Sequence, residues 1–350
     1  MSLKSFKKIR IIRGLINLKS YQDQHPEPSV VTIGAFDGLH LGHQRVIEQL
    51  DNYPGKKIII LFEPVLPKEF FSNNKIPRIS RLRDKLIFLD QLEIDAVLLI
   101  KFDQKFSELA PQDFIKNILI TGLNTRVLII GDDFKFGFKR AGDFNLLKSQ
   151  AYFKTYPTET LFKLDPLENP KRVASSWVRE LIMAGDFSGV KNLLGRAYCL
   201  TGKVGHGDKK GRVLGFPTMN IFLKNPMAVS GVYLVKVAGV NGRIFYGLAN
   251  VGTRPTLTQG LKRLLEVYLI LDLVSPLAGE TGLKAEPKAR EGAQFNTALN
   301  AYGLNISVEF VQKIRDEQKF GSLEGLRAQI EKDLTHAKLL VKMPSYLISN

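Results

Sequence analysis

Cysteine and long apolar runs are both scarce in this sequence. Cys199 is the single cysteine among 350 residues, so no internal disulfide can form, and a reducing cytoplasm is the expected location. No apolar run approaches the roughly 18 residues that a membrane helix requires. The basic N-terminal segment has no apolar stretch followed by a small-residue cleavage site, so we expect neither a membrane span nor a signal peptide.

Acidic residues are outnumbered, with 34 Asp and Glu against 50 Lys and Arg and a net charge of +16. Such a charge suits a nucleic-acid-binding protein, for example an RNA-associated regulator, or an enzyme that handles several phosphates. The basic residues are spread along the chain, without a basic tail or a nucleic-acid-binding motif. We therefore expect small-molecule partners, with no nucleic acid, no membrane and no obligatory protein partner.

The first half of the chain alternates apolar runs with helical patterns. The longest amphipathic segment spans residues 78–94, and the runs rich in Val, Ile and Leu span 29–34, 56–64, 95–102 and 126–134. Strands that are apolar throughout and alternate with helices are typical of a parallel sheet covered on both faces. We therefore predict a Rossmann-like α/β domain.

The second half consists mainly of short β-branched and aromatic runs separated by Gly, Pro and Asn. This pattern predicts a small antiparallel β-barrel. Helical periodicity returns near the end, where Ser322 and Glu324 favour a helix start. We place the two domains at 1–186 and 187–350. The segment 274–300 is rich in Ala, Gly, Glu and Lys without a period, which predicts a mobile loop inserted between two strands.

The most informative stretch is GAFDGLHLGH, residues 34–43, where a predicted buried strand ends and a helix begins. Ligands bind at such a position in a doubly wound sheet. The glycines let a ligand approach the backbone, and the helix start offers N–H groups and partial positive charge to phosphates. His40 and His43 are close enough in sequence to face the same phosphates.

Nucleotidyl transfer places extra negative charge on the attacked phosphorus, and positioned imidazoles and amide donors stabilise that charge without a covalent intermediate. The alternative is that the two histidines are incidental surface or zinc residues. No cysteine or carboxylate cluster accompanies them, which disfavours zinc. The stretch therefore favours a nucleotide-binding site.

The stretch 34–43 resembles the H-x-G-H signature of nucleotidyltransferases, and in its longer form the adenylyltransferase half of bacterial bifunctional riboflavin kinase/FAD synthetase enzymes. LFEP at 61–64, GDDFKFG at 131–137 and SSWVR at 175–179 match that family in the same order. The resemblance implies that His40 and His43 are catalytic and that the ATP-binding residues are Gly34, Phe36, Asp37, His40, Gly42, His43, Ser176 and Arg179. It places Asp133 and Phe134 near the flavin or the nucleotide.

A second group of motifs begins with GKVGHG at 202–207 and GRVLGFPTMN at 211–220. Its glycines would let backbone N–H groups surround phosphates. Thr218 and Asn220 share one face of an extended segment, and their oxygen atoms suit Mg²⁺ with phosphate. The alternative is an ordinary glycine-rich turn beside a strand, and residue chemistry alone does not separate the two. No G-x-x-x-x-G-K-[ST] motif is present, which disfavours a P-loop kinase.

These motifs, followed by NVGTRPT at 250–256 and KIRDEQKF at 313–320, resemble the riboflavin kinase half of the same family. The resemblance implies that Thr218 and Asn220 hold Mg²⁺ and ATP. It also implies that Glu266 is the base that accepts the proton of the riboflavin 5′-hydroxyl. The other kinase ATP-binding positions that it implies are Gly207, Gly211, Arg212 and Phe216.

The function that the resemblance implies is two-step FAD synthesis. Riboflavin is phosphorylated to FMN by ATP, and FMN then receives an adenylyl group from a second ATP, which gives FAD and pyrophosphate. Glu266 could instead be a solvated strand residue, although it stands alone in the apolar run LLEVYLIL. An alternative hypothesis is that the enzyme keeps only one of the two activities and that the insertion at 274–300 or an altered FMN pocket disables the other. The insertion could be a lid or an interaction surface, although its composition favours disorder.

Overall fold

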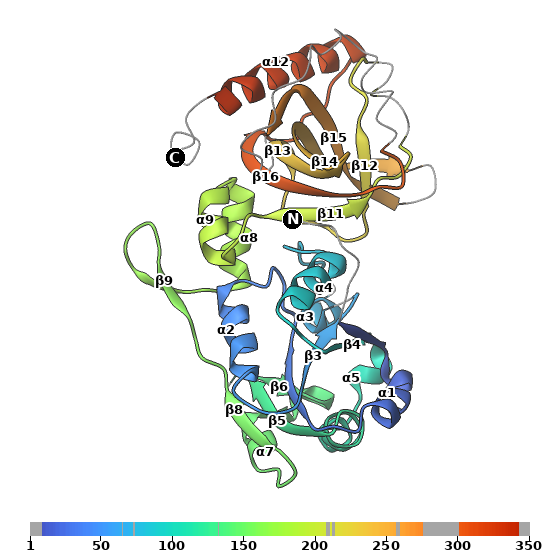
Figure 1. The fold of residues 1–350 in the computed structure, drawn as a ribbon, viewed down its shortest axis with the longest axis vertical. Helices are drawn as coiled ribbons and strands as arrows, with labels where there is room; N and C mark the ends of the chain where they lie inside the picture. The colour runs from blue at the N-terminus through green and yellow to red at the C-terminus, as the bar shows by residue number, and fades with distance from the viewer. Residues whose placement is uncertain are drawn as a thin grey trace. The chain divides into compact units, whose positions relative to one another are not determined.

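A computed structural model gives the fold and describes residues 9–64, 66–72, 74–131, 133–207, 211, 214–256, 260–275 and 301–342 (Figure 1). Of the predicted inserted loop, residues 276–300 lie outside this set, and 274 and 275 are the last residues of a strand. In the described part of the chain, no helix has the length and apolar composition of a membrane span.

Residue contacts divide the chain into two compact units that do not follow a single cut in the sequence. The N-terminal unit runs as far as Ile76 and resumes from Leu82 to Ser175. The C-terminal unit contains the short segment Pro77–Arg81 and begins again at Ser176. Each unit therefore has its own core.

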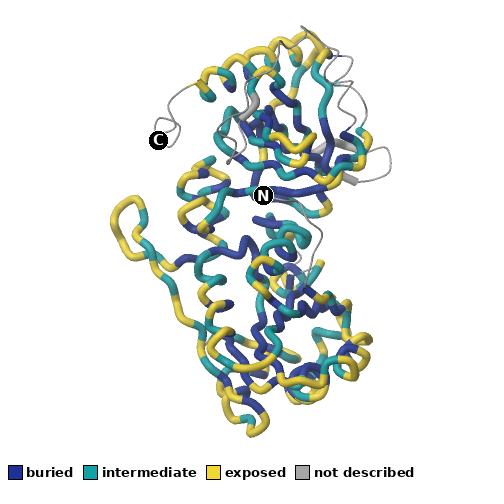
Figure 2. Tube along the Cα trace, in the orientation of Figure 1, coloured by how far each residue is buried: buried dark blue, intermediate teal, exposed yellow. Residues whose placement is uncertain are grey.

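A six-stranded parallel sheet forms the centre of the N-terminal unit, in the order β1-β4-β3-β2-β5-β8. Its strands are β1 (Arg10–Arg13), β2 (Ser29–Gly34), β3 (Lys56–Phe62), β4 (Ala96–Ile100), β5 (Thr125–Ile130) and β8 (Lys154–Pro157). The central strands are buried along almost their whole length, as the continuous apolar runs predicted (Figure 2). The Rossmann-like architecture is confirmed.

Alternate residues of these strands supply two separate hydrophobic clusters, one on each face of the sheet. On β3, Ile58 and Ile60 belong to one cluster, whereas Ile59 and Leu61 belong to the other. Helices α1 (Leu18–Gln24) and η2 (Phe114–Ile120) pack in the first cluster, and α2 (Leu41–Leu50) and α4 (Leu82–Gln91) pack in the second. Successive side chains of a strand point to opposite faces of the sheet, so each face is apolar and packs against its own helices.

Shorter elements fill the connections. In the N-terminal unit they are η1 (Leu15–Asn17), α3 (Pro67–Ser72), α5 (Gln104–Ser107), α6 (Pro111–Asp113), β6 (Lys135–Phe136), η3 (Phe138–Arg140), β7 (Gly142–Asp143), α7 (Phe144–Lys148), β9 (Phe162–Leu164) and β10 (Pro170–Arg172). Strands β9 and β10 form a two-stranded hairpin (Figure 1).

The predicted helix at 78–94 is wrong at its start, because α4 begins only at Leu82. The preceding residues pair with the C-terminal unit instead. The N–H of Arg78 donates to the carbonyl of Pro226 at 2.7 Å, and the N–H of Ala228 donates to the carbonyl of Arg78 at 2.8 Å. Tertiary hydrogen bonds here override a local helical pattern.

A six-stranded antiparallel sheet forms the C-terminal unit, in the order β11-β16-β13-β14-β15-β12. Its strands are β11 (Cys199–Lys203), β12 (Met219–Leu223), β13 (Gly231–Val240), β14 (Arg243–Thr256), β15 (Gly260–Ser275) and β16 (Asn305–Arg315). The two edges approach each other, since the N–H of Gly205 donates to the carbonyl of Asn220 at 2.8 Å. The sheet is therefore a near-closed barrel, and this part of the prediction is confirmed.

Among the described residues, α8 (Ser175–Ala184), α9 (Phe187–Leu194) and α12 (Leu323–Lys342) accompany the barrel. Helix α12 packs through Ala337 and Leu334 on a cluster from β13, β14 and β15. Arg315, at the end of β16, adds an ion pair with the buried carboxylate of Asp333. Its Nε lies 3.0 Å from both carboxylate oxygens, and a second guanidinium nitrogen lies 2.8 Å from one of them. This two-point contact fixes α12 against the barrel.

Replacing Asp333 by Ala should destabilise the C-terminal unit by about 3 kcal/mol, because the change leaves the Arg315 guanidinium without its buried counter-charge. Calorimetric unfolding of the full chain measures this effect. Glu331→Ala on the same helix is the matched control, since its ion pair with Arg327 is 55% and 63% exposed and should contribute less than about 0.5 kcal/mol. Equal effects of the two changes would contradict the assignment.

Candidate active sites

The turn between β2 and α2 carries the two predicted catalytic histidines. His40 is the N-cap of α2, and its Nδ1 accepts a hydrogen bond from the backbone N–H of His43 at 3.3 Å. The two rings are stacked, with centroids 3.6 Å apart and an interplanar angle of 20°. Because Nδ1 of His40 is an acceptor, the proton of the neutral ring is on Nε2, which becomes a donor.

The backbone of this turn is unusual. Phe36, Gly38 and Leu39 have φ values of 45°, 82° and 46°, in the left-handed region that only glycine adopts readily. A Cβ on Gly34 would lie 3.0 Å from the Phe36 ring, and one on Gly42 would lie 3.2 Å from the His40 ring. The space at these glycines is thus taken by aromatic rings of the turn itself, so larger residues would displace the rings.

Side chains from three elements donate hydrogen bonds to every second carbonyl of the turn. Lys85 Nζ on α4 donates to the carbonyl of Ala35 at 3.0 Å. Ser175 Oγ donates to that of Asp37 at 2.9 Å, and Gln44 Nε2 donates to that of Leu39 at 2.8 Å. Sequence reasoning missed Lys85, although the apolar residues three and four positions away on α4 place it on the buried face of that helix.

The other predicted residues of this half lie at several places. Asp133 is exposed, and Phe134 is half-buried and stacked on Phe136 with centroids 5.7 Å apart. Both follow β5, the neighbour of β2, so they share its carboxyl edge of the sheet. Ser176 is exposed and directly follows Ser175 in the chain. Arg179 belongs to the C-terminal unit, where its Nε donates to the carbonyl of Pro77 at 2.9 Å.

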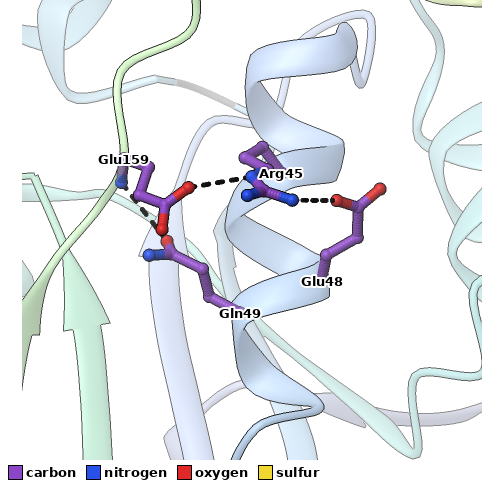
Figure 3. Close-up of polar contacts among 4 residues, drawn as sticks. All are labelled: Arg45, Glu48, Gln49 and Glu159. Atoms are coloured by element: carbon purple, nitrogen blue, oxygen red, sulfur yellow. Dashed lines mark hydrogen bonds and ion pairs between the residues drawn. The ribbon is translucent and has the colours of Figure 1, made fainter.

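Polar contacts tie the body of α2 to the chain that follows β8 (Figure 3). Arg45 lies 2.8 Å from Glu159 and 3.2 Å from Glu48, and the N–H of Glu159 donates to Gln49 Oε1 at 3.3 Å. The hydrogen bonds that Arg45 donates, first to Glu159 and second to Glu48, raise the pKa of Arg45. These side chains are exposed, so the contacts orient the segment more than they stabilise the unit.

The barrel places its predicted residues in one row. Asn220 on β12 is directly opposite Glu266 on β15, and Glu266 is directly opposite Asn250 on β14. Side chains at paired positions of an antiparallel sheet share a face, with Cβ atoms roughly 5 Å apart. Asn250 was not singled out from the sequence as a site residue. The sequence held a signal for it, because side chains alternate between the two faces of β14. Once the pairing of the strands is known, this alternation places Asn250 on the same face as Glu266.

Two glycines leave room around this row. A Cβ on Gly207 would lie 2.5 Å from Asn220 Nδ2, and one on Gly211 would overlap the carbonyl oxygen of Phe216. Asn220 is buried and donates from Nδ2 to the carbonyl of Thr218 at 3.2 Å. Gly207, Gly211, Phe216, Thr218 and Asn220 are therefore brought together, while Arg212 lies outside the described residues.

A groove of about 230 Å³ runs along β15 beneath α12, lined by Tyr268, Ile270, Asp272, Glu331, Leu334, Thr335 and Lys338. Tyr268 is two residues from Glu266 on the same face of the strand, and its ring meets Phe216 edge-on at 5.5 Å. Burial raises the pKa of Tyr268, so its hydroxyl remains a neutral donor at physiological pH. An ion pair between Lys338 and Asp272, 2.7 Å apart, bridges the helix and the strand.

Each half of the chain matches a different family model. A family model described as FAD synthetase matches residues 22–176, and one described as Riboflavin kinase matches residues 194–341. A curated "Bifunctional riboflavin kinase/FMN adenylyltransferase" from Haemophilus influenzae is 39% identical and covers 94% of this chain and 98% of its own. The Escherichia coli K12 protein of the same name is 36% identical and covers 93% and 96%.

The fold has a counterpart among solved structures. A crystal structure described as a macrolide-efflux protein from Streptococcus pneumoniae covers 95% of this chain and 99% of that chain, with a TM-score of 0.65 and 23% identity, and supports the fold alone. The two matches, one in each half of the chain, define a class of two-domain transferase. The chain belongs to the bifunctional riboflavin kinase/FMN adenylyltransferase family.

Substitution of Gly207 by Ala tests whether the barrel cluster is a working site. The added methyl group would displace Asn220, so we expect riboflavin phosphorylation to fall by roughly 10²-fold. FAD formation from supplied FMN should not change. Gly321→Ala is the control, because a Cβ there meets no atom within 4 Å. Normal phosphorylation by the Gly207 variant would remove Asn220 from the site.

Proposed function

We propose that this enzyme makes FAD in two steps at two sites, with His40 and His43 acting in adenylyl transfer and Glu266 acting in riboflavin phosphorylation. Membership of the family carries the two activities: ATP phosphorylates riboflavin to FMN, and a second ATP adenylates FMN to FAD with release of pyrophosphate. The stacked histidine pair at the N-cap of α2 is the observation that best supports the placement of the second step.

In the adenylyl-transfer step, a phosphate oxygen of FMN attacks the α-phosphorus of ATP and pyrophosphate leaves. The N-terminus of α2 and the Nε2 donor of His40 would stabilise the negative charge that develops on the phosphate oxygens. The ring of His43 stacks on the ring of His40. We assign Ser176 and Arg179 to contacts with the ATP phosphates, and Asp133 and Phe134 to the flavin or the nucleotide. Gly34, Phe36, Asp37 and Gly42 shape the ATP-binding turn.

In the kinase step, Glu266 accepts the proton of the riboflavin 5′-hydroxyl while that oxygen attacks the γ-phosphorus of ATP and ADP leaves. Asn220 lies opposite Glu266 in the register, which supports a shared role in phosphate chemistry. We assign the flavin ring system to the groove that begins at Tyr268, where Tyr268, Ile270 and Leu334 offer apolar contacts among polar side chains. Gly207, Gly211, Arg212 and Phe216 complete the proposed ATP site.

Mg²⁺ is part of this proposal, and the residues present fit it. The amide of Asn220 donates from Nδ2 to the carbonyl of Thr218, so its oxygen is the end available for a hard cation. The space beside it at Gly207 is one that a Cβ would fill. Thr218 and Asn220 would hold Mg²⁺, which when bound would neutralise charge on the ATP phosphates.

The division of labour extends to the domains. We assign adenylyl transfer to residues 1–186 and riboflavin phosphorylation to 187–350. This gives α8 to the first activity, although all of the helix after Ser175 belongs to the C-terminal unit. A cytoplasmic location is also proposed, on the basis of the single cysteine.

One product assay tests the function. Purified protein with riboflavin, ATP and Mg²⁺ should give FMN and then FAD, separated by chromatography. Accumulation of FMN alone, or FAD only from added FMN, would show that one activity has been lost. Formation of neither product would refute the proposal.

Glu266→Gln should lower the rate of FMN formation by about 10²- to 10⁴-fold, because the amide cannot accept the proton. The side chain keeps its size, so the strand should pack as before. FAD formation from supplied FMN is the internal control and should stay at the wild-type rate. A variant that still phosphorylates riboflavin normally would exclude Glu266 as the base.

His43→Ala should lower FAD formation by about 10²- to 10³-fold, because an aromatic donor beside the phosphates is lost. Riboflavin phosphorylation should continue unchanged in the same sample. His336→Ala, at an exposed position on α12, is the control for removal of a histidine. If His43→Ala abolished both products in folded protein, the assignment of one activity to each half would be wrong.

A further inference from the structure

Lys85 is a fully buried cation in the N-terminal unit. It lies on α4 between apolar residues, and its side chain has no exposed area. Lysine is rarely buried in this way without a specific partner, because its charge loses hydration. The position therefore calls for a physical explanation that packing alone does not give.

The ammonium group of Lys85 makes two short contacts. Nζ lies 2.7 Å from Oε1 of Glu63, whose side chain is only 9% exposed, and donates to the carbonyl of Ala35 at 3.0 Å. Glu63 follows β3, and Ala35 follows β2, so the lysine joins the carboxyl ends of two adjacent strands. Glu63 supplies the counter-charge, and Ala35 is the neutral acceptor.

Ala35 directly precedes Phe36, whose φ is positive, at the start of the turn between β2 and α2, here called the histidine turn because it leads to His40 and His43. In a trans peptide the carbonyl and the next N–H point in opposite directions. Holding the carbonyl of Ala35 towards Lys85 therefore turns the N–H of Phe36 away from it. The peptide plane that enters the turn is fixed by this one hydrogen bond.

Lys85 differs from the other side chains that bind carbonyls of this turn. Ser175 and Gln44 donate from neutral groups to the carbonyls of Asp37 and Leu39. The bond from Lys85 is charge-assisted, which makes it roughly twice as strong as a neutral one. Like Ser175, Lys85 comes from a helix far away in sequence, and Lys85 also pairs with a residue that follows β3, so it ties the turn to the core of the sheet.

We propose that Lys85 is a positioning residue for adenylyl transfer, which orients the Ala35–Phe36 peptide and thereby the turn that presents His40 and His43 to the phosphates of ATP. The inference rests on the proposed function of that turn. Lys85 acts through Ala35 and does not itself touch the substrate. Loss of the bond should lower turnover more than substrate binding, because the reacting groups move relative to each other.

The test compares Lys85→Met with the double variant Glu63→Met/Lys85→Met in the full chain. The single change leaves the Glu63 carboxylate buried without a counter-charge and should lower the melting temperature. The double change removes both charges and should restore much of the stability. Both variants lack the bond to Ala35, so each should lose about 10²-fold in kcat for FAD formation, with KM for FMN and ATP changed much less.

Two controls separate positioning from stability. Riboflavin phosphorylation by the same polypeptide should remain normal in both variants. Lys56→Met, which removes a 41% exposed lysine at the other end of β3, should leave FAD formation unchanged.

The outcomes are distinct. A double variant that regains stability but not kcat supports positioning, whereas one that regains both shows that the pair serves stability alone and overturns the inference. Wild-type kcat in Lys85→Met overturns it as well. If the wild-type chain forms no FAD from FMN, the proposed function itself fails, and the inference fails with it.

Discussion

The turn between β2 and α2 must hold a backbone conformation that side-chain-bearing residues avoid. Phe36 and Leu39 both have positive φ, at a cost of about 1–3 kcal/mol each. The surroundings supply what the local sequence lacks: hydrogen bonds to three carbonyls, and a histidine that caps the following helix. The geometry of the proposed adenylyl-transfer site depends on this constraint, because His40 and His43 take their positions from it.

The proposed kinase site depends on a different constraint, the register of the antiparallel barrel. Asn220, Glu266 and Asn250 come from three separate strands and form a row only because these strands pair as they do. A shift of one residue would send Glu266 to the opposite face of the sheet. Space beside the row matters equally, since the glycine at 207 leaves room for Asn220. In the C-terminal half, the side chains of the row are positioned by strand pairing and by the room beside a glycine, and not by a strained backbone.

Much of the architecture could be predicted from hydrophobic pattern. Continuous apolar runs indicated buried parallel strands, and short separated runs indicated the barrel, because burial on both faces and burial on one face leave different periods in a sequence. The start of α4 could not be predicted in the same way. Residues before Leu82 have helical periodicity, but Arg78 pairs with Pro226 and Ala228, and such distant hydrogen bonds leave no local signal. Lys85 was missed because its partners, Glu63 and Ala35, are also distant in sequence.

The sequence by itself determined the two-domain plan, the family and the identity of the residues with reactive side chains. Those properties depend on residue type and order, which can be compared directly with other sequences. The tertiary structure alone decided which strands pair, that Asn250 lies beside Glu266, and that a buried lysine holds the entrance to the histidine turn. These properties depend on contacts between residues far apart in the chain, and their energy depends on burial that exists only after folding.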